Sequence, residues 1–161
     1  MVELALNAGL RVAEMASLTH GSMLIDGTRS SIRVVGKGNK KRTVWISADF
    51  KKICLLYFRL KTFFGLSTDN DSPLLCAASG RAICKRVLQK SFKQLTAVAG
   101  LSDHYAIHSL RHTYSTFLLR ASLHNYRFVQ RQLGHASIRT TQVYAGVLES
   151  EGRKALEQLY A

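Results

Sequence analysis

The sequence is poor in proline, cysteine and acidic residues, and each shortage excludes a class of protein. One proline among 161 residues, with no repeat or low-complexity tract, leaves no sign of a linker between two domains. Cys54, Cys76 and Cys84 lack paired metal-ligand spacing and are odd in number, so we exclude a disulfide scaffold and expect a reducing, cytoplasmic compartment. Ten Asp and Glu residues supply little material for the paired carboxylates of a two-metal nuclease, and we expect no metal or other cofactor.

Long apolar stretches are missing as well. The longest strongly apolar run, Ile53–Phe58, is far shorter than the roughly 20 residues that span a bilayer. No secretory signal opens the sequence, because Glu3, Arg11 and Glu14 interrupt its first sixteen residues. With 47% hydrophobic and 20% charged residues, we expect one soluble globular domain that does not contact a membrane.

Positive charge dominates what is there. The chain holds 23 Lys and Arg against 10 Asp and Glu, a formal net charge of +13. Residues 28–66 alone hold ten Lys and Arg against Asp49, a net of +9 (10 − 1). This concentration predicts an electropositive face for a polyanion, and nucleic acid is the commonest polyanion in the cytoplasm.

Hydrophobic spacing predicts helices with one small sheet. Leu6, Leu10 and Ala13 recur at helical spacing and predict a helix over Leu4–Ala16. Three short β-rich runs follow, and turn-forming residues between them favour antiparallel pairing. The expected strands are Ser22–Asp26, Ser31–Val35 and Arg42–Ile46.

Helical patterns return after the sheet. Ser47 is suited to cap a helix that runs to about Phe64, and a loop over Thr68–Pro73 follows. Further helices are expected at about 81–99, 108–121, 125–133, 138–144 and 147–160. The expected fold class is mainly α with a small three-stranded antiparallel sheet (α+β).

The helix around His108 has the most informative polar side chains. At about 100° per residue, it has an apolar stripe and an opposite polar face. The stripe comprises Leu110, Tyr114, Phe117, Leu118 and Ala121, and the polar face comprises His108, Arg111, His112 and Ser115. Because His108 and Arg111 are surface neighbours, the guanidinium can grip phosphate oxygens while the imidazole shuttles a proton. A solvated polar face without function fits the same pattern.

Tyr144 and His135 are further candidates. A tyrosine can attack phosphorus as a covalent nucleophile if a base accepts its proton and cations stabilise the charge. Tyr144 is one of six tyrosines, however, and a buried amphipathic tyrosine is the ordinary alternative. His135 follows Gly134 and fits a helix C-terminal cap equally well.

Five short segments have a characteristic order. They are NAGLRVAE at 7–14, VGKGNKKR at 35–42, HSLRHT at 108–113, LGHAS at 133–137 and TTQVY at 140–144. In turn, they resemble the first arginine motif, the β-hairpin lysine motif, the H-x-L-R-H-[TS] helix, and the closing L-G-H and T-T-x-x-Y pair of the tyrosine recombinases (the phage integrase family). Each piece alone is a weak signal, whereas all five in register over nearly the whole chain form a strong one.

The resemblance implies a catalytic role for several residues of this sequence. Arg11 and Arg111 would hold the two non-bridging oxygens of a scissile DNA phosphate, which suits a transition state that needs preorganised cations. Tyr144 would attack the phosphate, forming a 3′-phosphotyrosyl link and freeing a 5′-hydroxyl. Lys37, at the hairpin tip, would protonate that leaving group. His108 would be the base near the tyrosine.

The remaining site residues follow from the same resemblance. His135 would be a further donor to the phosphate. Lys40, Lys41 and Arg42 lie close to Lys37 in sequence and are expected to contact the DNA backbone. His112 is expected to be structural or to touch DNA. Arg11 would be held by Glu14, although a surface ion pair on a helix is the alternative.

The resemblance also implies partners and domain organisation. Double-stranded DNA is the expected partner, bound by a homotetramer that exchanges a C-terminal helix between subunits; packing of that apolar tail on its own domain is the alternative, and a monomer is possible in isolation. The family usually has a helical DNA-clamping domain before this one. We therefore expect residues 1–161 to be a single catalytic domain, truncated at its N-terminus and without the clamp.

Site-specific DNA recombination of the integration or excision type is the leading expectation. A type IB topoisomerase shares the chemistry, but compact size, the L-G-H motif and the short spacing to Tyr144 favour a recombinase. A DNA-binding module of this fold, inactive as isolated, is the alternative from another class. An RNA-binding protein would expose stacking aromatics, whereas most aromatics of residues 28–66 have helical core spacing.

Overall fold

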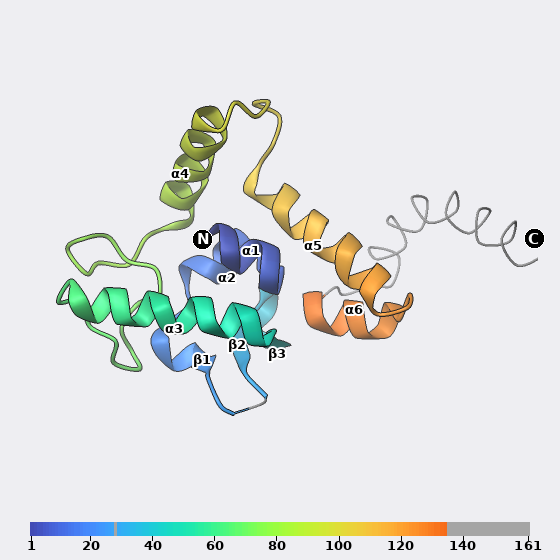
Figure 1. Cartoon of the computed structure of the whole chain (residues 1–161), viewed down its shortest axis with the longest axis horizontal. Coiled ribbons are helices and arrows are strands. Elements are labelled where there is room, and N and C mark those ends of the chain that lie inside the picture. Colours follow the sequence, from blue (N-terminus) through green and yellow to red (C-terminus); the bar gives the residue numbers. More distant parts are fainter. Residues whose placement is uncertain (28, 135–161) are drawn as a thin grey trace, which may run out of the picture.

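The described part of this protein consists of helices and one small sheet (Figure 1). The computed structural model describes residues 1–27 and 29–134. The helices are α1 (Val2–Ala8), α2 (Val12–Ala16), α3 (Ala48–Phe63), α4 (Lys85–Val98), α5 (Ile107–Ala121) and α6 (Tyr126–Leu133), with 3-10 turns η1 (His20–Ser22) and η2 (Lys37–Asn39). The strands are β1 (Met23–Leu24), β2 (Ser31–Val35) and β3 (Lys41–Trp45). The expected fold class is confirmed.

The three strands form an antiparallel sheet in the order β1-β2-β3. The longer pairing joins β2 to β3, with Ser31 opposite Trp45 at one end and Val35 opposite Lys41 at the other. The strand bounds lie within one or two residues of those expected from the sequence. The β2–β3 hairpin therefore presents its turn, with η2, at the end of the ladder that lies beyond Val35.

The single helix expected over Leu4–Ala16 is wrong, because the chain breaks there into α1 and α2. Gly9 ends α1 in the left-handed conformation (φ 61°), and its N–H donates to the carbonyl of Ala5 (3.1 Å). Helical spacing continues across the break, since Leu10 is buried in the core, so periodicity alone could not locate it. The break turns Arg11 into the N-cap residue of α2.

Most of the other expected helices are present. Ser47 caps α3 as predicted, with its hydroxyl accepting from the N–H of Phe50 (3.2 Å). Helices α5 and α6 lie within one residue of their expected bounds, while α4 begins four residues late. Helix α4 begins later than expected because the residues before it form a turn in which Cys76 pairs with Ala82. The helices expected at 138–144 and 147–160 lie outside the described residues.

The buried face of α5 differs from the expected apolar stripe. Helix α5 packs against α1, and its most buried residues are Ile107, Arg111, Ser115 and Leu119. Phe117 of the expected stripe is instead 61% exposed. Arg111 and Ser115 of the polar face are buried, because the small alanine side chains of α1 allow close approach and the carbonyl of Gly9 accepts from Arg111, whereas His108 and His112 are exposed.

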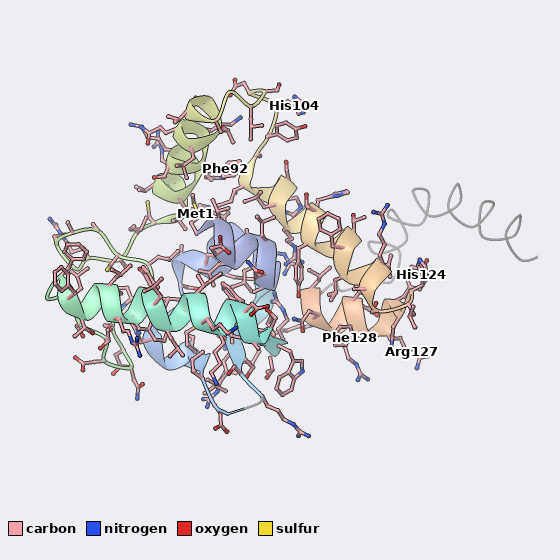
Figure 2. All side chains as sticks on the ribbon, in the orientation of Figure 1. Met1, Phe92, His104, His124, Arg127 and Phe128 are labelled. Carbon is pink, nitrogen blue, oxygen red and sulfur yellow. The ribbon has the colours of Figure 1, made fainter. Side chains whose placement is uncertain are left out.

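Two apolar clusters hold the elements together. The larger one lies between α1, α2, the sheet and α3, and Phe92 of α4 reaches it beside Met1 (Figure 2). The smaller one joins α5 to α6 through Leu119, Val129 and Leu133. Figure 2 also shows His124, Arg127 and Phe128 at the far end of this helix pair. Among the described helices, none is both long and apolar enough to cross a membrane.

Gly9 gives a test of the break between α1 and α2. A Cβ there would overlap the Tyr114 ring and come within 2.8 Å of Leu133 Cδ2, whereas Gly100 (φ 66°) has the same backbone conformation with no described atom within 4 Å. Gly100→Ala should therefore cost about 1 kcal/mol of unfolding free energy for its backbone alone. Gly9→Ala should cost a further ~1–3 kcal/mol for the overlap, as measured by urea denaturation. Equal losses in both variants would contradict this packing.

Candidate active site

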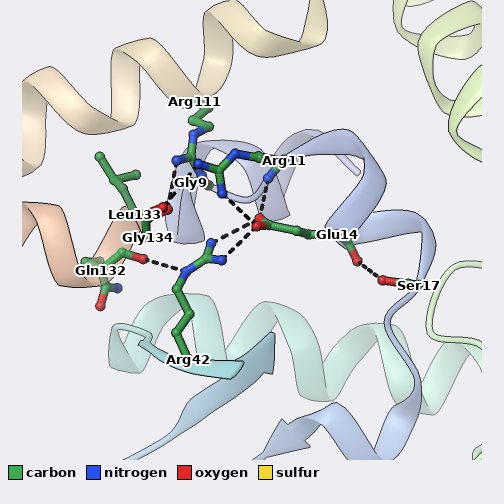
Figure 3. A network of polar contacts seen from close by, with 9 residues as sticks. All are labelled: Gly9, Arg11, Glu14, Ser17, Arg42, Arg111, Gln132, Leu133 and Gly134. Carbon is green, nitrogen blue, oxygen red and sulfur yellow. Dashed lines mark hydrogen bonds and ion pairs between the residues drawn. The ribbon is translucent and has the colours of Figure 1, made fainter. Parts of the chain in front are cut away.

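Arg11 lies at the junction of α1 and α2, where its side chain faces the end of α6 (Figure 3). Its backbone N–H donates to Glu14 Oε2 (2.8 Å), and its Nη1 donates to Glu14 Oε1 (2.9 Å). Its Nη2 donates to the carbonyl of Gly134 (3.2 Å). The side chain is still 40% exposed, so an anion in solution can reach its guanidinium.

Arg111 approaches the same place from α5 and is buried. Its Nη1 donates to the carbonyl of Gly9, and its Nη2 donates to the carbonyl of Leu133 (2.8 Å). The two predicted phosphate-binding arginines thus reach neighbouring carbonyls of one short segment, although 100 residues separate them in the sequence (111 − 11). The structure brings the two arginines together, as the resemblance to the tyrosine recombinases implies.

The end of α6 is held by three guanidinium groups (Figure 3). The donor and acceptor pairs are Arg42 Nε with Gln132 (3.3 Å), Arg111 Nη2 with Leu133 (2.8 Å) and Arg11 Nη2 with Gly134 (3.2 Å). Carbonyls at a helix C-terminus lack partners within the helix and carry the negative end of its dipole, so cations stabilise them. Gly134 adopts the left-handed conformation that ends the helix, directly before His135.

Glu14 is the shared acceptor at the centre of the site. Its side chain is only 4% exposed, and its two oxygens accept four hydrogen bonds from Arg11 and Arg42. Burial by itself raises the pKa of this carboxyl, but the hydrogen bonds and charges of Arg42 and Arg11 outweigh it and hold the pKa below its ordinary value. Glu14 therefore stays ionised at neutral pH. The predicted Arg11–Glu14 contact is present, but as a buried cluster rather than a surface pair.

Strand β3 separates the basic residues that the sequence places together. Lys41 and Thr43 are exposed on the outer face, while Arg42 and Val44 point toward the interior. The Arg42 side chain is 13% exposed, and its Nη1 and Nη2 donate to the two Glu14 oxygens at 2.7 and 3.0 Å. Contact with the DNA backbone stays a prediction for Lys40 and Lys41, which are exposed. For Arg42 it conflicts with a guanidinium already engaged inside the protein.

His108 and His112 are both exposed on α5. Partial desolvation, and after it the charges of Arg111, Arg11 and His112, lower the pKa of His108. A histidine with a lowered pKa is neutral at pH 7 and can accept a proton. The expected base thus has the protonation state that the role requires.

The hairpin lysine lies at the tip expected for it. Lys37 begins η2, and the turn closes with the N–H of Gly36 donating to the carbonyl of Lys40 (2.8 Å). Gly38 and Asn39 adopt the left-handed conformation (φ 72° and 59°), which reverses the chain between β2 and β3. His135 and Tyr144, the other predicted catalytic residues, lie outside the described residues.

Sequence reasoning missed Gln132, which is buried at the edge of the sheet. Its side-chain amide bonds both backbone groups of Trp45, accepting from the N–H (3.1 Å) and donating to the carbonyl (2.6 Å). The amide nitrogen also donates to the Tyr114 hydroxyl (3.1 Å). Gln132 thereby ties α6 to β3 as an added strand would. Its position directly before the L-G-H segment was the available signal.

Taken together, these groups form an anion site beside a proton acceptor. One partly exposed guanidinium and one buried guanidinium can meet the charge of a phosphate, and His108 supplies the neutral imidazole. Within residues 1–27 and 29–134, no three His, Cys, Asp or Glu side chains gather as metal ligands. The arginines of this site can stabilise negative charge, and the histidine can transfer a proton.

Comparison with known proteins identifies the family of this chain. The sequence matches the phage integrase family over residues 1–151. This chain belongs to that family. It is 33% identical over 144 residues to the tyrosine recombinase XerC of Vibrio cholerae, covering 89% of this chain and 45% of that protein. It is 37% identical over 145 residues to XerC of Chromohalobacter salexigens, with 89% and 46% covered.

Solved structures share the fold of this phage integrase family member. The XerA recombinase is 31% identical with a TM-score of 0.78, covering 99% of this chain and 56% of that one. The XerH recombinase in its post-cleavage complex with a difH substrate has a TM-score of 0.78 at 23% identity, covering 99% and 45%. The chain spans about half the length of the curated relatives it matches.

The ionised state of Glu14 predicts how stability depends on pH. The pKa of Glu14 is lower in the folded protein than in the unfolded chain, where it is about 4.3. Ionised Glu14 therefore stabilises the fold above that pH, and this stability is lost as the pH falls through the pKa of the folded state. Glu14→Gln should lower the unfolding free energy at pH 7 by about 3 kcal/mol, because Arg42 loses a buried partner. The gap should narrow steadily between about pH 5 and pH 3. Urea denaturation across this range measures it, and a gap independent of pH would contradict the assignment.

Proposed function

We propose that this protein cleaves and rejoins double-stranded DNA as the catalytic domain of a site-specific recombinase, through a 3′-phosphotyrosyl intermediate. The observation that supports this most strongly is the convergence of Arg11 and Arg111, from separate elements, at the end of α6 beside His108. The kinship with tyrosine recombinases points to the same chemistry. Recombination of the integration or excision type is the natural role that we assign.

The cleavage step follows from the roles of the arginines. Tyr144 Oη bonds to the phosphorus of a scissile phosphate, and His108 takes the phenolic proton. Arg11 and Arg111 hold the two non-bridging oxygens and meet the charge that builds on them. His135, next to Gly134, adds a donor to the same phosphate.

The leaving group is activated from the hairpin. The bond from phosphorus to the 5′-oxygen breaks as Lys37 donates a proton to that oxygen, giving a free 5′-hydroxyl. The reverse step, by the 5′-hydroxyl of another strand, expels Tyr144 and joins new partners. The phosphotyrosyl bond keeps the energy of the broken phosphodiester, so the exchange needs neither nucleotide hydrolysis nor a cofactor. Since guanidinium groups supply the cations, the reaction should also proceed without a metal ion.

DNA binding relies on exposed cations around this centre. Lys40 and Lys41 stand on the open side of the hairpin, and His112 lies one residue after Arg111 on α5. We assign these three to contacts with the DNA backbone, which position the duplex without reading its sequence.

The assembly on DNA is a tetramer in our proposal. Each subunit would dock a C-terminal helix on its neighbour, as the apolar residues near the end of the sequence favour, and a monomer would exist without DNA. We place the reaction in the cytoplasm of a bacterial or phage-infected cell, in association with the nucleoid, because the tyrosine recombinases that this chain resembles come from bacteria.

Plasmid relaxation tests the proposal without knowledge of the target site. Supercoiled plasmid incubated with the full chain in EDTA should relax and give an SDS-stable protein–DNA adduct. Both should disappear in Tyr144→Phe and remain in Tyr105→Phe, the control, because Tyr105 is an exposed tyrosine outside the site. Gel electrophoresis with and without protease measures both.

Two outcomes would overturn the proposal. Cleavage that requires magnesium and survives in Tyr144→Phe would contradict phosphotyrosyl chemistry. Salt-sensitive DNA binding without any adduct would favour a binding module of the same fold. Sequencing the DNA ends in the adduct identifies the cleaved site. A plasmid that carries two copies of this site then separates recombination from relaxation, because a deletion product forms only if strands are exchanged.

A further inference from the structure

Arg42 is the buried cation of this site that the cleavage step does not use. It comes from β3, three residues after the end of η2 in the hairpin turn, and its neighbour Lys41 faces solvent. All three of its donor nitrogens have protein acceptors, namely Gln132 O for Nε and the two Glu14 oxygens for Nη1 and Nη2. Three of its five N–H groups are therefore engaged inside the protein, and the side chain is only 13% exposed.

Arg42 contacts both of the segments that carry the predicted phosphate ligands. On one side it shares the Glu14 carboxylate with Arg11, which occupies Oε1 and Oε2 as well. On the other side its side chain lies flat against Gly134, where an added Cβ would be 2.8 Å from Arg42 Cδ. The absence of a side chain at Gly134 is what lets the guanidinium pass beneath the end of α6.

We propose that Arg42 is a positioning residue for strand cleavage, which holds the β2–β3 hairpin, the Arg11–Glu14 pair and the end of α6 at Gln132–Gly134 in one fixed arrangement. This inference rests on the proposed function above. The rigid fork of arginine is needed, since it makes two parallel bonds to a carboxylate and keeps a third donor at Nε. A lysine could supply charge but not this geometry.

The expected effect lies on the rate of cleavage rather than on DNA affinity. If Arg42 only sets geometry, Arg42→Gln should lower the relaxation rate at saturating protein by about tenfold to a hundredfold. The matched comparison is Lys41→Gln, which removes the same charge one residue away on the opposite face of β3. Lys41→Gln should weaken binding to a fluorescent 30-base-pair duplex and reduce the slope of log affinity against log salt by about one, whereas Arg42→Gln should leave the slope unchanged.

A pH profile separates positioning from a general loss of structure. Among the described residues, the charged groups that face Glu14 are Arg11 and Arg42. Without Arg42, the burial of Glu14 is balanced by one guanidinium only, so its carboxyl should titrate at higher pH. The acid limb of the relaxation rate in Arg42→Gln should therefore move toward neutral pH. Arg42→Lys, which keeps the charge, should return the acid limb close to that of the unaltered chain and restore only part of the rate.

NMR measurements on the protein without DNA test the contacts of Arg42 independently of DNA cleavage. Carbon-13 NMR of the Glu14 carboxyl and nitrogen-15 NMR of the Arg11 Nε–H report, without DNA, how Arg42 affects these two groups. If Arg42→Gln does not fold, Arg42→Lys is measured in its place. An unshifted Glu14 titration in Arg42→Gln would overturn the inference, as would unshifted Arg11 signals in Arg42→Lys. A salt slope that falls by one with a normal maximal rate in Arg42→Gln would also overturn it. If the unaltered chain neither relaxes plasmid nor forms an adduct, the proposed function fails, and the NMR titration still decides whether Arg42 holds Glu14 and Arg11.

Discussion

A single buried carboxylate organises this molecule. The Glu14 carboxylate accepts hydrogen bonds from Arg11, the N-cap residue of α2, and from Arg42 of β3, so it ties these two elements together. The cost of placing an ion away from water is met because both of its oxygens are bonded and two guanidinium groups face it. One consequence is chemical: Arg11, though partly exposed, has a fixed position before any substrate arrives, which is the preorganisation that electrostatic catalysis requires.

The end of α6 has the complementary role. Its carbonyls attract the three arginines from three elements, and the amide of Gln132 adds a bridge to the edge of the sheet. The helix terminus thus gathers cations that would otherwise repel one another. A phosphate placed beside Arg11 and Arg111 would meet guanidinium groups that backbone carbonyls and, for Arg11, the Glu14 carboxylate already hold in place, so little reorganisation is left for the binding step.

Sequence reasoning found the class, the sheet and most helices, because hydrophobic period, turn residues and the Ser47 cap are local signals. It failed where tertiary contacts decided the outcome. Gly9 breaks a helix whose apolar spacing is continuous, since the Tyr114 ring occupies the space of a side chain there. The helical pattern alone also allowed a solvated Arg111, because no local signal indicates that the carbonyl of Gly9 accepts from it. The alternation of β3 indicates that Arg42 points inward, whereas the only signal for Gln132 is its position directly before the L-G-H segment, which does not reveal its bonds to Trp45.

The most direct test of the central claim is to identify the residue that becomes bonded to DNA. The covalent adduct formed on plasmid in EDTA can be digested with nuclease and protease and its peptides analysed by mass spectrometry. The account predicts one modified peptide, with a nucleotide joined through its 3′-phosphate to Tyr144. A nucleotide on any other side chain, or linked through a 5′-phosphate, would contradict it.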